Sequence, residues 1–318
     1  MRCACRSITG IPSLKILLTG AAGQLGSELV GLLSGHGQVV ATDRVSKIPE
    51  TVSWVEMDIC NGGALEVLLN RLRPSLIVNA AAYTAVDLAE TESETAFEVN
   101  ASLPGRLAHW VRSNDARLIH YSTDYIFNGD ASQPYRESDI PDPQNVYGDS
   151  KLAGENAITA SRCRHAILRT SWVYSSHGKN FVLSMLDLAR RGLALKVVND
   201  QLGCPTWARN LAQASDSIIK KWTGPAAVHD GGIFHYCDDQ TLSWYDFARA
   251  IFTLGVNTGL LDHEPDLTPV PDTEFPQPAK RPKWSVLDTC MIGEVFNIHP
   301  VSFKQSLQAV IGEVAARG

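Results

Sequence analysis

The chain has 318 residues, of which 44% are hydrophobic and 19% are charged, and this composition is typical of a globular protein of one or two domains. Its net charge of −6 gives no reason to expect binding to nucleic acid, and no apolar run approaches the ~20 residues of a membrane span. The seven cysteines are scattered without zinc-site spacing, which favours reduced thiols in a cytoplasmic protein. Residues 1–13 lack the apolar segment of a secretory signal, so we expect a disordered extension there, with a short targeting segment as the alternative.

A glycine-rich loop lies between the first predicted strand, residues 15–19, and a helix whose leucines fall on one face. The GxxGxxG spacing in this context is typical of a dinucleotide site, because glycines let the backbone approach a pyrophosphate and the helix N-terminus offers free N–H groups. The loop therefore predicts binding of NADPH or NADH. The loop residues assigned to the cofactor are Gly20, Gly23, Gln24, Leu25 and Gly26.

Two acidic residues end the next predicted strands, residues 39–42 and 54–59. Asp43 lies about 20 residues beyond the glycine loop, where a carboxylate can bind the adenosine ribose hydroxyls. Arg44 could instead bind a 2′-phosphate, so the pair leaves NADH against NADPH open. Asp58 is a second candidate for the adenosine end, although an Asp after a strand is also a common turn residue.

Strands and helices continue to alternate as far as Thr170. This alternation predicts an α/β fold with a Rossmann-type, doubly wound parallel sheet, which we assign to residues 14–170. The small residues 80–84 follow a strand at the sheet edge where such folds bind ligands, and residues 128–145 read as a loop. The further strands predicted here are residues 76–79, 118–122 and 166–170, and the helices are residues 64–72, 86–113 and the segment that starts at Tyr147.

Beyond Thr170 this rhythm loosens, and prolines cluster between residues 265 and 282. We expect residues 171–318 to form a smaller C-terminal lobe that is mainly substrate-binding, with some segments returning to the first domain. Helices are predicted at residues 181–190, 209–222, 244–254 and 302–311, and strands at residues 196–198 and 233–236.

Tyr147 and Lys151 are four residues apart, which places them on one face of a helix, one turn above each other. A neighbouring ammonium favours the phenolate form of a tyrosine, so we expect Lys151 to lower the pKa of Tyr147. Such a pair can exchange a proton with a carbonyl or an alcohol near neutral pH. Alone the pair is a weak signal, because a surface helix can carry the same two residues.

Six strings in order resemble the dTDP-4-dehydrorhamnose reductase family, in the extended branch of the short-chain dehydrogenase/reductase superfamily. They are NAAAYTAVD from residue 79, HYSTDYIF from 120, NVYGDSKLAGE from 145, RTSWVY from 169, NDQLGCPT from 199 and PAKRP from 278. The resemblance extends from about residue 15 to the C-terminus. It implies that a nicotinamide hydride reduces the C4 ketone of dTDP-4-dehydro-β-L-rhamnose.

The resemblance also implies roles for individual side chains. Tyr147 would protonate the ketone oxygen, and Thr123 would hydrogen-bond the same atom, with a turn cap as the structural alternative for Thr123. The implied catalytic residues are Tyr147, Lys151 and Thr123. The implied substrate contacts are Thr123, Asp124, Trp172, Asn180 and Arg281, the last as a diphosphate clamp. The implied cofactor contacts are Asp58, Ile59, Ala82, Tyr83, Thr84, Tyr147 and Lys151, in addition to Asp43, Arg44 and the glycine loop.

Some members of the family form dimers through Mg²⁺ that glutamates of both subunits hold, and Glu28 matches one of these acids. Residues 189–194 contain no acid where the family pattern would place another, and Mg²⁺ binds weakly without carboxylates. We therefore expect no metal site and leave a homodimer open.

Two other functions share parts of this pattern. A nucleotide-sugar 4,6-dehydratase or epimerase has the same fold and Tyr/Lys pair, but a dehydratase usually carries two acids beside its catalytic threonine, and here only Asp124 follows Thr123. The regulatory subunit of methionine adenosyltransferase also resembles these reductases, although a binding protein has no need of the Tyr147–Lys151 pair. The main prediction is a reductase of a small nucleotide sugar, with no nucleic-acid or membrane partner.

Overall fold

The computed structural model describes residues 14–45, 52–224 and 231–317, so the extension expected at residues 1–13 lies outside the described part. Its centre is a seven-stranded sheet in the order β11-β6-β5-β4-β1-β2-β3, and every pair of neighbours runs parallel. The predicted doubly wound α/β fold is confirmed. The strands are β1 (Leu14–Thr19), β2 (Gly37–Asp43), β3 (Ser53–Glu56), β4 (Leu76–Asn79), β5 (Arg117–Thr123), β6 (Arg164–Thr170) and β11 (Gly231–His235).

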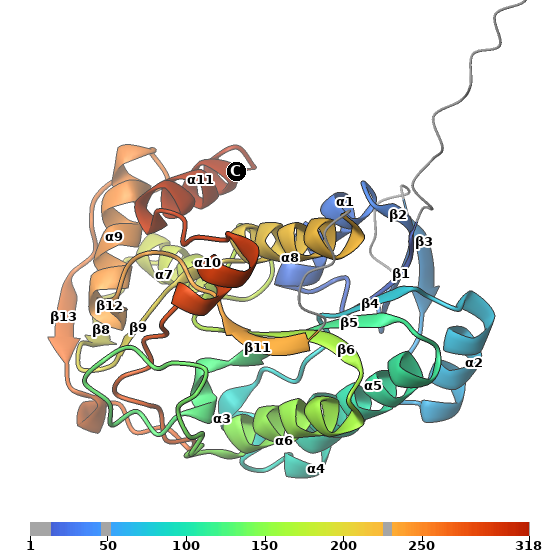
Figure 1. The fold of residues 1–318 in the computed structure, drawn as a ribbon. Helices are drawn as coiled ribbons and strands as arrows, with labels where there is room; N and C mark the ends of the chain where they lie inside the picture. The colour runs from blue at the N-terminus through green and yellow to red at the C-terminus, as the bar shows by residue number, and fades with distance from the viewer. Residues whose placement is uncertain (1–13, 46–51, 225–230, 318) are drawn as a thin grey trace, which may run out of the picture.

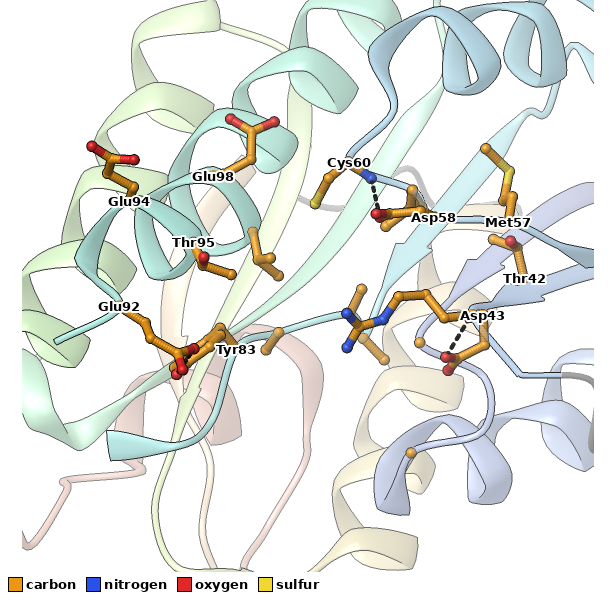
Figure 2. A pocket seen from close by; sticks show the side chains of 18 residues that line it. Thr42, Asp43, Met57, Asp58, Cys60, Tyr83, Glu92, Glu94, Thr95 and Glu98 are labelled. Atoms are coloured by element: carbon orange, nitrogen blue, oxygen red, sulfur yellow. Dashed lines mark hydrogen bonds between the residues drawn. The ribbon is translucent and has the colours of Figure 1, made fainter. Parts of the chain in front are cut away.

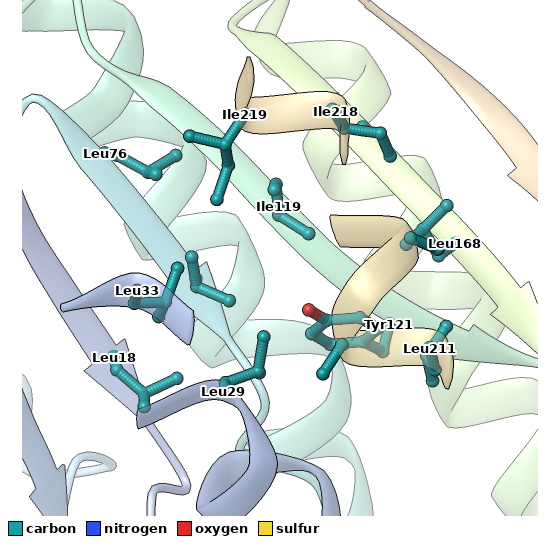
Figure 3. Packing of buried hydrophobic residues seen from close by; sticks show 14 of the residues in the cluster. Leu18, Leu29, Leu33, Leu76, Ile119, Tyr121, Leu168, Leu211, Ile218 and Ile219 are labelled. Carbon is teal, nitrogen blue, oxygen red and sulfur yellow. The ribbon is translucent and has the colours of Figure 1, made fainter. Parts of the chain in front are cut away.

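Helices cover both faces of this sheet, and for this reason its strands are nearly continuous apolar runs. Figure 1 shows α1 and α8 on one side of the sheet and α5 and α6 on the other. On the first side, Leu29 and Leu33 of α1 and Leu211 of α8 pack over Leu18 and Ile119 of the strands, as Figure 3 shows. The helices of the two layers are α1 (Gln24–Leu33), α8 (Ala208–Thr223) and α10 (Cys290–Phe296) on one face, and α2 (Gly62–Leu72), α5 (Leu103–Ser113) and α6 (Val146–Ser161) on the other.

The segment predicted as one helix at residues 86–113 is broken in the structure. It divides into α3 (Val86–Ala89), α4 (Ser93–Phe97), a π-helical turn (Glu98–Ser102) and α5. The π turn contains the fully buried Asn100, whose side chain bonds to groups outside the helix. Single π turns of this kind are frequent at functional sites.

A second, smaller core lies beside the sheet and is built from segments beyond Thr170. Tyr174, Phe247 and Phe303 meet edge to face within it, and α7, α9 and α11 enclose them. The chain also returns to the main sheet, because β11 pairs with β6. The elements of this part are α7 (Phe181–Arg190), α9 (Trp244–Asn257), α11 (Phe303–Ala315), and the strand pairs β7 (Val173–Tyr174) with β10 (Thr206–Trp207), β8 (Leu195–Val198) with β13 (Leu267–Val270) and β9 (Leu202–Gly203) with β12 (Leu242–Ser243).

The strand order reverses between β1 and β4, and open α/β sheets bind ligands at the carboxyl ends of the strands beside such a point. Three segments meet at this edge: the glycine loop after β1, residues 80–84 after β4, and Thr123 at the end of β5. Within the described ranges, no helix is both long enough and apolar enough to cross a membrane.

Candidate active site

The glycine loop after β1 leaves no space for a side chain at Gly20 or Gly26. Gly20 has a φ of +66°, and a Cβ atom there would lie 2.5 Å from the backbone nitrogen of Ala81. A Cβ on Gly26 would overlap the carbonyl oxygen of Gly20 at 2.1 Å. Gly23 caps α1 without a side-chain hydrogen bond, so the first N–H groups of that helix face outward. This bare backbone at a helix N-terminus fits the pyrophosphate of a dinucleotide.

A cavity of about 650 Å³ extends from this loop past the ends of β2 and β3. Asp43 and Asp58 lie on one of its sides and Tyr83 with Glu92 on the other, as Figure 2 shows. The carboxylate of Asp43 accepts hydrogen bonds from the backbone N–H of Ala22 at 3.0 Å and of Arg44 at 2.7 Å. Asp43 therefore holds the glycine loop against β2 and also borders the cavity.

Asp58 and Ile59 lie just past β3, which is shorter than predicted and ends at Glu56. Both line the cavity, and the carboxylate of Asp58 accepts the backbone N–H of Cys60 at 3.0 Å. This bond is the turn contact that was the alternative expectation for Asp58. It uses one carboxylate oxygen, and the other one is left for a ligand in the cavity.

A second cavity, of about 370 Å³, adjoins the first, since Gly23, Ala80 and Ala82 line both. Its lining brings together predicted residues from distant parts of the chain, namely Gln24, Leu25, Gly26, Thr84, Tyr147 and Lys151. The two cavities form a continuous cleft across the carboxyl edge of the sheet, with Asp43 at one end and the Tyr147–Lys151 pair at the other. A dinucleotide fits a cleft of this shape and lining.

The Tyr147–Lys151 pair lies in the first turns of α6, whose N-cap is Asn145. The Asn145 side chain accepts the N–H of Gly148 at 2.8 Å and donates to the carbonyl oxygen of Lys280 at 2.8 Å, so it also ties α6 to the second lobe. Lys151 is 2% exposed, and burial lowers its pKa to about 8. At neutral pH its ammonium form still predominates.

The expected effect of Lys151 on Tyr147 is wrong for this structure. Burial raises the pKa of Tyr147 to about 12, and only the side chain of Thr123 acts in the lowering direction. The phenol loses its hydration in the second cavity, and this loss outweighs the effect of Thr123. Tyr147 is consequently a neutral phenol at neutral pH, which is the form that can donate a proton.

Thr123 and Asp124 lie together at the end of β5, beside Tyr147. The hydroxyl of Thr123 donates to Oδ1 of Asp124 at 3.0 Å and accepts the N–H of Tyr125 at 3.2 Å. The ring of Tyr125 meets that of Tyr147 edge to face, with 5.7 Å between centroids. Thr123 thus forms the turn bond that was its structural alternative, and at the same time it reaches Tyr147.

Trp172 occupies a left-handed backbone conformation with a φ of 48°, which is uncommon for a bulky residue and typical of functional sites. Its indole stacks on that of Trp244, with 3.5 Å between centroids and 7° between planes. A Cβ on Gly203 would lie 2.5 Å from the same indole. The ring is therefore held closely by its neighbours and is only partly exposed.

Arg281 lies at a third cavity, of about 430 Å³, together with Lys280 and Lys283. Its guanidinium forms a bidentate ion pair with Asp87 of α3, with both N···O distances at 2.9 Å. Nη1 also donates to the carbonyl oxygen of Ala279 at 3.2 Å, so only part of the five N–H donors of the arginine is left for other partners. Asp130 and Asp272 also line this cavity, so its three cations exceed its carboxylates by one, and this excess suits an anionic ligand, as expected for this segment.

The placement of Asn180 differs from the expectation that it helps Arg281. Its side-chain oxygen caps α7 by accepting the N–H of Leu183, and its nitrogen donates to Gln24, Ser175 and His177. These bonds occupy the donors and an acceptor of the Asn180 amide, and they lie near the glycine loop. In this structure Asn180 positions Gln24 instead of facing the third cavity.

Three residues that join these parts were not singled out from the sequence. Asn100 accepts the N–H of Tyr83, donates to its carbonyl oxygen and donates to Ser150 of α6, and so links the cofactor side to the Tyr147 helix. Asn145 and Asp87 connect the 279–281 segment to the same region. The Asn before the helix start was a readable cap signal, whereas the other two depend on contacts between distant segments.

Comparison with known proteins decides the family. The family described as "RmlD substrate binding domain" matches residues 14–316. Over 276 residues the chain is 40% identical to the dTDP-4-dehydrorhamnose reductase of Salmonella typhimurium. The match covers 87% of this chain and 90% of that protein. The chain belongs to the dTDP-4-dehydrorhamnose reductase family.

Two further relatives of this chain are informative. A dTDP-4-dehydrorhamnose reductase of Bacillus anthracis, solved in complex with NADP, is 31% identical with a TM-score of 0.82, and the match covers 95% of this chain and 99% of that one. A probable dTDP-4,6-dihydroxy-2-methyloxan-3-one 4-ketoreductase of Streptomyces antibioticus is 39% identical over 276 residues, 86% of each chain.

Glu28, the acid that matched a metal-binding position of the reductase family, has a protein partner here. Arg209 of α8 pairs with Glu28 at 2.8 Å and with Glu313 of α11 at 2.6 Å. The guanidinium thus lies between two carboxylates and offsets part of their charge. Among the described residues, no cluster of three His, Cys, Asp or Glu side chains could hold a metal ion.

Proposed function

We propose that this protein reduces the C4 ketone of dTDP-4-dehydro-β-L-rhamnose to the alcohol of dTDP-β-L-rhamnose, with NADPH or NADH as the reductant. The family membership supports the reaction class. The observation that carries the proposal is that Tyr147 and Lys151 line the second cavity of the cleft that begins at the glycine loop, with Thr123 beside Tyr147.

The chemistry divides between the cofactor and this chain. A bound reduced nicotinamide supplies a hydride for C4 of the sugar. Negative charge then builds on the ketone oxygen, and a donor must stabilise it and protonate it. Tyr147 is neutral at pH 7 because burial holds its pKa at about 12, so its hydroxyl can give that proton. The hydroxyl of Thr123 favours the phenolate that remains, because it acts on the pKa of Tyr147 in the lowering direction.

The nucleotide part of the substrate needs positive charge, because the chain as a whole carries −6. Lys280, Arg281 and Lys283 supply it at the third cavity, and the Asn145–Lys280 hydrogen bond joins that cavity to the start of α6. We assign the diphosphate to this cavity and the sugar to the space between it and Tyr147. An edge of Trp172 provides apolar surface for the deoxysugar.

The test is a coupled reaction. dTDP-glucose, a 4,6-dehydratase, a 3,5-epimerase and this protein are incubated with NADPH or NADH, cofactor oxidation is followed, and the product sugar is identified by NMR. We expect stoichiometric cofactor consumption and dTDP-L-rhamnose as the product. An absence of cofactor consumption, or a different product sugar, would refute the proposal. Net consumption also separates a reductase from a dehydratase or an epimerase, which regenerate their cofactor.

A second substrate deserves a direct comparison, because the Streptomyces relative is a probable 4-ketoreductase of another dTDP-sugar and is 39% identical. The third cavity and the Tyr147 site would serve both ketones. The two are separated by kcat/KM on each, measured with one enzyme preparation. The proposal requires the higher value for dTDP-4-dehydro-β-L-rhamnose.

A homodimer stays a separate prediction, which sedimentation of the purified protein tests.

A further inference from the structure

Residues 175–180, which we call the 175–180 segment, connect β7 to α7 and belong to the second lobe. Hydrogen bonds fix one side of this segment to α11. The hydroxyl of Ser176 donates to Oε2 of Glu313 at 2.6 Å, and Nη1 of Arg317 donates to the carbonyl oxygen of Ser176 at 2.9 Å. At its end, the side chain of Asn180 caps α7. The segment is therefore anchored at two helices of the second lobe.

The other side of the 175–180 segment is bound to Gln24, the first residue of α1. The side-chain oxygen of Gln24 accepts the hydroxyl of Ser175 at 3.0 Å and the amide of Asn180 at 2.9 Å. Its side-chain nitrogen donates to the carbonyl oxygen of Lys179 at 3.3 Å. Gly178 has a φ of +74°, and a Cβ atom there would lie 3.0 Å from Cγ of Gln24. One side chain at the end of the glycine loop thus holds the segment in place.

This arrangement brings Lys179 to the cofactor cleft. Lys179 lines the second cavity together with Gly23, Gln24 and Gly26. Its side chain is exposed, and within the described residues its ammonium has no hydrogen-bond or ion-pair partner. The backbone of Lys179 is held while its charge is left for a ligand that lies on the glycine loop.

The charges along the cleft show why a cation is needed there. Among the described residues, the second cavity is lined by two lysines and by no carboxylate. Lys151 lies on α6 with Tyr147, whereas Lys179 lies on the side of the glycine loop. The pyrophosphate of a dinucleotide is anionic, and the start of α1 offers it N–H groups without a full charge. The first cavity cannot supply the charge, because it holds Arg44 against the carboxylates of Asp43, Asp58, Glu92, Glu94 and Glu98.

We propose that Lys179 binds the pyrophosphate of the nicotinamide cofactor and that Gln24 is the positioning residue that holds Lys179 at the glycine loop. The inference rests on the proposed function, because it concerns the cofactor of that reaction. A lysine suits this place, since its ammonium binds phosphate as a point charge and has three donors. The cation comes from the second lobe, so a bound cofactor contacts both parts of the molecule.

The nucleotide sugar also carries a diphosphate, and the same ammonium chemistry could bind it. We assign Lys179 to the cofactor because it lines the cavity of the glycine loop, whereas Lys280 and Arg281 line the third cavity. ADP-ribose and dTDP separate the two diphosphates, because the first is a fragment of the cofactor and the second is a fragment of the substrate. Neither fragment can react, so binding is measured without turnover.

Lys179→Met is tested by isothermal titration calorimetry with ADP-ribose, NADH, NADPH and dTDP. We expect the first three ligands to bind about 5- to 20-fold more weakly, as for a charge-assisted hydrogen bond that is partly exposed to solvent, while dTDP changes little. The loss should shrink at high salt, because ions screen an exposed charge. A loss for dTDP alone, a loss for NADPH alone, or no loss for any ligand would overturn the proposal.

Two further variants separate the position of the charge from its presence. Lys179→Arg keeps a cation and should retain most of the affinity for ADP-ribose. Lys196→Met is the matched control, because Lys196 is an exposed lysine of β8 that pairs with Glu274 at 3.3 Å and lines neither cavity of the cleft. It should bind all four ligands like the wild type. An equal loss in Lys196→Met would attribute the effect to net charge and contradict the assignment.

The positioning role of Gln24 is tested by a double-mutant cycle with ADP-ribose. Gln24→Met keeps the length of the side chain and removes its hydrogen bonds to the 175–180 segment. We expect weaker binding, and a double variant with Lys179→Met that binds no more weakly than Lys179→Met alone. Additive losses, with circular dichroism showing folded proteins, would refute the positioning role. A wild type with all these binding effects that reduces no ketone would refute the proposed function instead.

Discussion

The ammonium group of Lys151 donates a hydrogen bond to the backbone carbonyl oxygen of Tyr121, with 2.6 Å between the two atoms. This contact ties α6 to β5 at the second cavity and fixes the charge of Lys151 one helical turn from Tyr147. Two N–H donors of Lys151 remain, and they lie where the ribose of a nicotinamide cofactor is expected. The contact therefore places one charge beside both the acid and the cofactor site.

Loss of this charge should appear in the pH dependence of the reaction. Burial lowers the pKa of Lys151 from 10.5 to about 8, so the ammonium is present below that pH and is lost as the pH rises through it. We expect kcat/KM to have a descending limb near pH 8 that is absent from Lys151→Met, together with weaker cofactor binding by the variant. A limb at the same pH in the variant would assign it to another group.

Tyr147→Phe removes the proposed acid and keeps the ring. We expect turnover to fall by about 10² to 10⁴, the usual contribution of a positioned general acid, while the cofactor dissociation constant changes little. The control is Tyr125→Phe, since the two rings are in contact but only one hydroxyl is assigned to the proton transfer. Equal losses in both variants would point to packing of the ring pair instead of acid catalysis.

Asp43→Ala tests the adenosine end of the cleft. The carboxylate holds the backbone of Ala22 and Arg44, so both cofactors should bind less tightly, and NADH should lose more because it depends on the ribose contact. Arg44→Ala should have the opposite bias and weaken NADPH more. Dissociation constants from nicotinamide fluorescence measure both effects, and equal losses of NADH and NADPH in Asp43→Ala would remove this residue from the ribose.

Two glycines on α1 make a matched pair for the loop. A Cβ on Gly26 would overlap the carbonyl oxygen of Gly20, whereas a Cβ on Gly31 would meet nothing within 4 Å. Gly26→Ala should destabilise the protein by about 1–3 kcal/mol and weaken cofactor binding. Gly31→Ala should stabilise it by about 0.5–1 kcal/mol. Thermal unfolding with and without NADPH reports both, and similar melting temperatures for the two variants would contradict the close packing at Gly26.

Much of the main sheet could be read from the sequence because its strands are buried on both faces and are therefore apolar runs between helices. Residues 76–79 were predicted with the bounds that β4 has, and residues 181–190 with those of α7. The two-residue strands β7, β9, β10 and β12 were not predicted, because two residues carry no periodicity. The break at Asn100 was missed because its cause is a bond to a distant loop.

The candidate site shows the same limit at the level of chemistry. Spacing predicted that Tyr147 and Lys151 share a helix face, and the family strings predicted which residues gather around them. The pKa of Tyr147 moved opposite to the expectation, because desolvation depends on every atom around the hydroxyl and not on one neighbour in the sequence. Asn180 likewise was placed by its hydrogen bonds to Gln24, which no local pattern encodes.

In the proposed reaction, hydride reaches C4 of the sugar while this chain supplies the proton. The most direct measurement uses NADPH that carries deuterium at the transferable position of the nicotinamide, with dTDP-4-dehydro-β-L-rhamnose in ordinary water. We expect dTDP-L-rhamnose with one deuterium, bound to C4, from the wild type and almost no product from Tyr147→Phe. Product without deuterium at C4, or labelled product formed equally fast by Tyr147→Phe, would contradict it.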